Sequence, residues 1–149
     1  NRAEKLAKNN DDADETKRKN GLAITINPRN GGNFHIREQW KDKEDVASLD
    51  NKIKDFTNLF DDKKLPTKLP YDLRTLATSL KYRNISDKLM IKNEIKVLLK
   101  RKQQNTESIK SVIKPRIEEI KNVKDLFEFA EEMLVAQWFA MAKQIKEVK

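Results

Sequence analysis

The sequence has no cysteine, a single histidine, three glycines and four prolines. Without cysteine, disulfides, zinc–thiolate sites and cysteine nucleophiles are excluded, although the compartment stays open because exported proteins can also lack cysteine. With His35 as its only histidine, the chain cannot form a His-pair metal site or an HExxH motif. The scarcity of glycine and proline, beside 38% charged residues, favours a mostly α-helical protein.

Long apolar runs are also missing. The longest run, 133–142, is interrupted by Gln137 and is too short to cross a bilayer. The chain starts at Asn1 rather than Met, so we expect a processed mature chain or a trimmed one, which leaves room for a leader that has been removed.

Motifs of known enzyme classes do not survive inspection. Ser111 and Lys114 have Ser-x-x-Lys spacing without the companion motifs of that class. Glu128, Glu131 and Glu132 lack the Glu-x-x-His pairs of helical metal sites. We therefore predict a protein that is not an enzyme, with no catalytic residues, no cofactor and no metal site.

Apolar residues at helical spacing predict a mostly α fold, a bundle of about five helices around a long apolar C-terminal helix. The predicted helices cover 43–61, the segment from Pro70 towards Tyr82, 88–104, 107–121 and Val123–Val148. Ser86 and Asp87 are expected to cap the third, and Asn122 the last. Pro115 predicts a kink or a break near Ile113, because proline removes a backbone donor.

The last helix is apolar on nearly every side in its middle, which is typical of a buried helix. Val135, Phe139 and Ala142 fall on the side that should face water. In a monomer another segment must cover them, and the apolar stretch 22–36 is the candidate. If these three residues are exposed instead, we expect a subunit contact and a homodimer.

The N-terminal residues divide into two parts. Residues 1–20 are almost wholly polar and predict a tether or a frayed helix, so we expect one helical domain over 21–149. Residues 22–26 and 33–36 alternate in polarity around turn residues that include Asn30-Gly31, which predicts a short β-hairpin or an irregular arm.

Positive charge is concentrated in one part of the chain. Residues 63–102 hold twelve Lys or Arg against three Asp or Glu, although the whole chain carries only +8. Lysines recur every four residues from Lys88, which places them one turn apart on a helix. The predicted binding residues are Lys81, Arg83, Lys88, Lys92, Lys96, Lys100, Arg101 and Lys102.

Such an array attracts a polyanion, for example a glycosaminoglycan, or an acidic macromolecule. An equally weighted interpretation is a solvated face whose lysine stems shield apolar neighbours. Nucleic acid is an alternative only as a non-specific partner, because no aromatic residue lies within 83–126 to stack on bases.

The polar start AEKLAKNNDDADETKRKN, the segment DVASLDNKIKDFTNLF and the central apolar helix together resemble the small exported or outer-surface helical lipoproteins of borrelial spirochaetes. That resemblance implies a membrane-tethered, non-enzymatic protein that meets host molecules at the cell surface or in the periplasm. Two alternatives remain, a cytoplasmic protein that binds nucleic acid non-specifically and a structural or assembly protein that acts as an oligomer.

Overall fold

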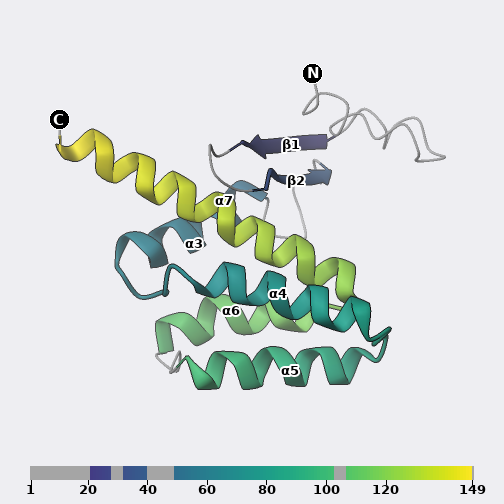
Figure 1. Cartoon of the computed structure of the whole chain (residues 1–149). Coiled ribbons are helices and arrows are strands. Elements are labelled where there is room, and N and C mark those ends of the chain that lie inside the picture. The colour runs from purple at the N-terminus through teal and green to yellow at the C-terminus, as the bar shows by residue number, and fades with distance from the viewer. Residues whose placement is uncertain (1–20, 28–31, 40–48, 103–106, 149) are drawn as a thin grey trace.

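Five helices and a two-stranded antiparallel sheet make up the described part of the chain (Figure 1). The computed structural model describes residues 21–27, 32–39, 49–102 and 107–148. The elements are β1 (Gly21–Ile26), β2 (Phe34–Gln39), α3 (Leu49–Asp61), α4 (Leu69–Tyr82), α5 (Lys88–Arg101), α6 (Glu107–Glu119) and α7 (Val123–Val148). The predicted fold is confirmed, with the hairpin in place of an irregular arm. The predicted tether 1–20 and the predicted helical residues 43–48 lie outside the described residues.

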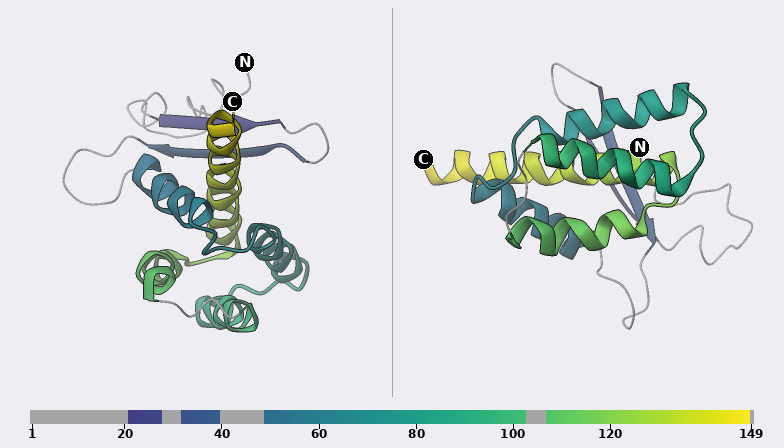
Figure 2. Two further views of the ribbon diagram at one scale, coloured as in Figure 1. Left: turned by 90° about the vertical axis from the view of Figure 1, so that its left-hand side faces the viewer. Right: turned by 90° about the horizontal axis from the view of Figure 1, so that it is seen from below.

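Helix α7 is the centre of the fold. It packs chiefly against α3 and α4, and its outer side contacts β2 (Figure 2). Residues 132–137 are buried without interruption over more than a full turn, so the helix is enclosed on all sides there. The one amide in this stretch is satisfied, because Gln137 Nε2 donates to the carbonyl of Thr67 at 2.9 Å.

Two helices end in the same way, with a residue in the left-handed region. Lys63 (φ 55°) follows α3 and Asn84 (φ 54°) follows α4. After α4, the amide of Asn84 donates to Lys81 O and that of Ile85 donates to Leu80 O, which is the Schellman pattern. These turns reverse the chain and allow neighbouring helices to pack against each other.

Two predicted helix starts are confirmed, and of the pair Ser86 and Asp87 it is Asp87 that caps α5. Asp87 Oδ1 accepts a hydrogen bond from the amide of Met90 at 2.7 Å, and Asn122 Oδ1 accepts one from Asp125 at 2.9 Å. At the second cap, Asp125 Oδ2 also accepts from the amide of Lys121, so two amides that have no partner within the helix are satisfied.

Of the kink or break expected near Ile113, the break does not occur. Helix α6 runs through this residue from Glu107 to Glu119. Pro115 is exposed, whereas Ile109, Ile113 and Ile117 are buried on one side of the same helix. Burial of that stripe offsets the lost hydrogen bond, which lies on the exposed side.

The hairpin sits on the opposite side of α7 from α5, with β2 next to the helices and β1 outside it (Figure 1). Ile24 pairs with Ile36 and Ile26 pairs with Phe34, so the four apolar side chains share one face of the sheet. Phe34 packs β2 against α4, because its ring meets the ring of Tyr71 edge-on, with the two ring centres 6.4 Å apart.

Candidate interaction surface

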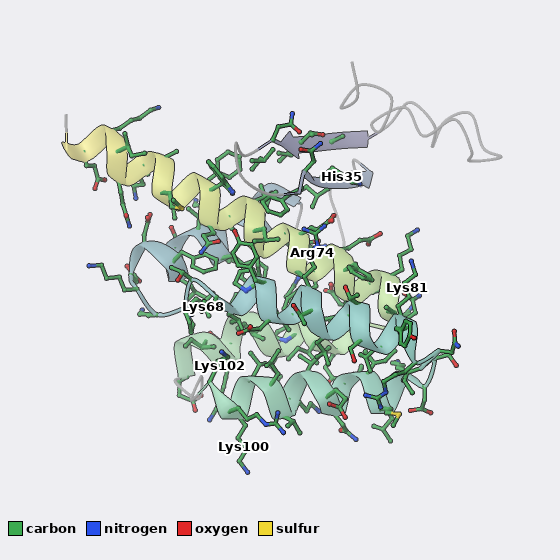
Figure 3. The ribbon with its side chains drawn as sticks, in the orientation of Figure 1. His35, Lys68, Arg74, Lys81, Lys100 and Lys102 are labelled. Atoms are coloured by element: carbon green, nitrogen blue, oxygen red, sulfur yellow. The ribbon has the colours of Figure 1, made fainter. Side chains whose placement is uncertain are left out.

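The predicted basic residues do not form one cluster. Lys81 lies at the end of α4, whereas Lys100 lies near the far end of α5, and Figure 3 shows the two on opposite sides of the molecule. The run from Lys88 to Lys100 spans about 18 Å along the axis of α5. Six of these residues are exposed, and Lys92 and Lys102 are not. The exposed residues are Lys81, Arg83, Lys88, Lys96, Lys100 and Arg101.

Lys92 departs from the expected exposed array, because it is only 7% exposed. Its Nζ donates to Glu118 Oε2 at 2.7 Å and to the Glu118 carbonyl at 3.0 Å. That carbonyl lies in the last turn of α6, where it has no partner within the helix and where a positive charge is favourable. Lys92 therefore joins α5 to the C-terminal end of α6.

Lys102 also has a structural contact. Its Nζ lies 2.7 Å from Asp72 Oδ2, a contact that links the end of α5 to the first turn of α4. Both side chains are about one-third exposed, so the pair contributes little free energy to the fold.

A groove of about 530 Å³ lies between α5 and α6. We call it the α5–α6 groove, and it is lined by apolar residues (Leu99, Ile109, Ile113, Ile117) and by four lysines (Lys96, Lys100, Lys110, Lys114). We call the second set the groove lysines. No acidic side chain is among the described residues that line it.

Sequence reasoning missed half of the groove lysines. Lys110 and Lys114 fall in 103–149, where acidic and basic residues balance, so charge counting passed over them. The signal that could have found them is the repeated Ile-Lys pair, Ile109-Lys110 and Ile113-Lys114. At four-residue spacing this pair places an apolar stripe beside a basic stripe on one helix.

The outer face of α5 is partly apolar. Leu89 is 67% exposed, and Met90 and Val97 are also exposed. Tyr82 at the end of α4 is exposed as well. The basic residues of α5 therefore stand among apolar side chains.

The three residues proposed for a subunit contact have different environments. Val135 is fully buried in the hydrophobic core. Phe139 is 45% exposed and Ala142 is exposed. The C-terminal turns of α7 extend beyond the other helices in Figure 1, and Met141 and Ile145 are exposed there too.

A group of charged side chains between α6 and α7 stabilises the fold. Arg116 contacts Glu119 at 2.6 Å and also contacts Glu132, and its guanidinium lies 5.9 Å from the centre of the Phe129 ring. These contacts connect α6 to α7. In the described ranges no group of three or more acidic or histidine side chains is placed to hold a metal ion.

His35 lies half-buried on β2, in the region where Arg74 of α4 approaches the hairpin (Figure 3). Arg74 stacks over the Phe34 ring at 5.5 Å. Burial raises the pKa of Glu131 on α7, and the positive charges of His35 and Arg74 oppose that rise. Glu131 therefore marks a place where the folded state disfavours the ionised carboxylate.

Glu131→Gln is expected to stabilise the protein near neutral pH, by less than about 1 kcal/mol because the side chain is half-exposed. A pKa raised in the folded state contributes stability at low pH that is lost as pH rises through the folded pKa. The gain should therefore shrink as pH falls through the raised folded pKa, and it should be lost below pH 4.5, the ordinary pKa of this carboxyl.

Urea unfolding at several pH values measures this difference. Glu147→Gln, an exposed change on the same helix, is the control for lost negative charge. A Glu131→Gln variant that is less stable at neutral pH would show that attraction to His35 and Arg74 outweighs burial.

The described helices include none with the length and apolar character needed to cross a membrane.

Comparison with known proteins gave no relative. No protein-family model, no curated protein and no solved structure matches the chain.

Proposed function

We propose that this chain is a non-catalytic interaction protein that binds an anionic macromolecule through the basic face of α5 and α6. The observation that carries the proposal is the set of groove lysines, which surround one groove without an acidic neighbour in its described lining. Exposed ion pairs with Glu118 and Glu107 offset part of the charge of Lys96 and Lys110, and the positive potential that remains favours an anionic partner.

The revised basic face differs from the one that the sequence predicts. It keeps Lys96 and Lys100, adds Lys110 and Lys114, and leaves Lys92 to a structural role. Lys81, Arg83 and Lys88 lie towards the other end of α5 and extend the positive field without lining the groove.

We further propose that the protein acts at the cell surface or in the periplasm, held there by a lipid anchor. The resemblance to borrelial exported lipoproteins supports this placement. The residues encoded upstream of Asn1 test it: a lipobox cysteine there is expected, and a cytoplasmic start codon would contradict the proposal.

Changing the groove lysines to glutamine is expected to weaken salt-dependent binding to an anionic polymer. The slope of log K against log salt should fall by about one per lysine removed. Heparin and DNA columns, eluted with a salt gradient, provide the measurement. Stronger retention on heparin than on DNA would favour a surface polyanion over nucleic acid.

A matched control separates a local effect from net charge. Lys54, Lys63, Lys124 and Lys146 are exposed lysines elsewhere, and changing these four to glutamine removes the same total charge. If both quadruple variants lose retention equally, the groove lysines have no special role and the proposal fails.

A second candidate function is self-association through the C-terminal end of α7, which the exposure of Phe139, Met141 and Ile145 favours. Met141 and Ile145 lie four residues apart and so share one face of the helix. Two copies of such a face bury each other's apolar side chains in a symmetric homodimer.

Met141→Glu with Ile145→Glu is therefore expected to weaken dimerisation at least about tenfold, which corresponds to about 1.4 kcal/mol. Sedimentation velocity over a range of concentrations measures the change. Val97→Glu, at an exposed apolar position on α5, is the control and should leave the dimer intact. An unaltered chain that stays monomeric at every concentration would contradict self-association.

A further inference from the structure

The α5–α6 groove has an apolar lining in which Leu99 is half-buried and three isoleucines of α6 are almost fully buried. Ile109, Ile113 and Ile117 follow one another at four-residue spacing along α6, and Leu99 faces them from α5. This row extends about 12 Å along α6, which is two turns of a helix. A purely polar polymer such as heparin or DNA has no apolar group to place against the partly exposed Leu99 in this groove.

The charges lie along both sides of the apolar lining. Lys96 and Lys100 are one turn apart on α5, and Lys110 and Lys114 are one turn apart on α6. A single-chain anionic amphiphile carries its charge at one end, so it matches only part of this pattern. A flat anionic membrane favours protruding apolar side chains over a groove between two helices.

We infer that the groove binds the apolar face of an acidic amphipathic helix from a partner protein. Such a helix presents an apolar stripe, and its acidic residues follow both edges of the stripe at intervals of one turn. That arrangement complements the apolar lining and both lysine pairs at once. The inference rests on the proposed anionic partner and names its chemistry.

The groove lysines can leave their present ion pairs for a binding partner at little cost in folding free energy. Lys96 is 3.8 Å from Glu118, and Lys110 is 3.2 Å from Glu107, and these pairs are exposed. Exposed pairs of this kind contribute little to the stability of a fold, because solvent screens them. Lys100 and Lys114 have no ion-pair partner among the residues that the structure describes.

The test uses a fluorescent peptide of about four helical turns, with leucines along one face and glutamates on both sides. A second peptide of the same composition has its leucines scattered around the helix. Fluorescence anisotropy should show at least about tenfold tighter binding of the amphipathic peptide. Equal binding of the two peptides, or no binding of the first, would overturn the inference.

Two variants locate the peptide. Leu99→Trp fills the groove and should weaken binding about tenfold, whereas Val97→Trp on the outer face of α5 should not. Circular dichroism confirms that each variant is folded. Equal effects of the two changes, or no effect of either, would place the peptide elsewhere and overturn the inference.

A charge swap keeps the test decisive even if Leu99→Trp does not fold. Lys100→Glu with Lys114→Glu should lose the glutamate peptide and gain a version with lysine in place of glutamate. A double variant that keeps its preference for the glutamate peptide would overturn the inference.

Failure of this inference is distinguishable from failure of the proposed function. If the scattered and amphipathic peptides bind alike and only the groove-lysine variant weakens both, the basic face stands and the helical occupant is wrong. If the groove-lysine variant and its charge-matched control bind both peptides alike, the proposed function fails too. Flotation with vesicles that contain anionic phospholipid tests a lipid ligand. If the vesicles bind in a way that depends on Leu99 and the peptide does not bind, the groove binds lipid and the inference is overturned.

Discussion

Phe129→Ala is expected to destabilise the folded chain by about 3–5 kcal/mol, a large part of the total for a domain of this size. Phe129 is 2% exposed in the N-terminal half of α7. Its ring meets Phe56 of α3 edge-on at 5.8 Å, and Arg116 of α6 lies over it. One side chain thus joins three helices, and its removal leaves a cavity that none of them can easily fill.

Phe139→Ala is the matched control, since it makes the same change ten residues further along the same helix. Phe139 is 45% exposed, so its loss should alter the free energy of unfolding by about 1 kcal/mol or less. Urea unfolding of both variants at one protein concentration measures the contrast. Similar losses at the two positions would mean that α7 is not the centre of the fold.

The position of α7 could be predicted because its signal is local. Apolar residues at helical spacing define its range, and Asn122 marks its start, so the bounds Val123–Val148 are confirmed. The start of α5 could also be predicted, because Ser86 and Asp87 are residue types that favour helix caps, and Asp87 is the one that caps it. In each case the deciding contacts lie within a few residues of the chain.

The places where prediction failed depend on contacts between helices. Pro115 looked like a break, because the sequence does not show that it faces outwards while Ile113 and Ile117 are held in the core. The α5–α6 groove exists only when two helices pack side by side, so it cannot be predicted from the sequence of either helix alone. Half of its lysines therefore escaped notice.

Lys92, in the lysine array of α5, is another residue whose environment depends on packing between helices. Residues at four-residue spacing rotate by about 40° per step around a helix with 3.6 residues per turn. Lys100 has consequently turned well away from the direction of Lys92. Lys92 stays beside Ile95, on the buried side, and Lys100 projects into solvent, as Figure 3 shows for Lys100.

Lys92→Glu is accordingly expected to destabilise the protein by about 3 kcal/mol, through the fold and not through binding. The change removes both hydrogen bonds to Glu118 and places a buried carboxylate beside it. It also puts negative charge at the C-terminal end of α6, where the helix dipole opposes it. Unfolding in urea provides the measurement.

Two controls separate these causes. Lys88→Glu makes the same charge change at an exposed position on α5 and should alter stability by about 0.5 kcal/mol or less. Lys92→Met keeps the buried stem and should lose only about 1 kcal/mol, because Glu118 is half-exposed and water can replace the ammonium. If Lys92→Glu were as stable as Lys88→Glu, Lys92 would be free to leave Glu118 and would return to the basic face as a binding residue.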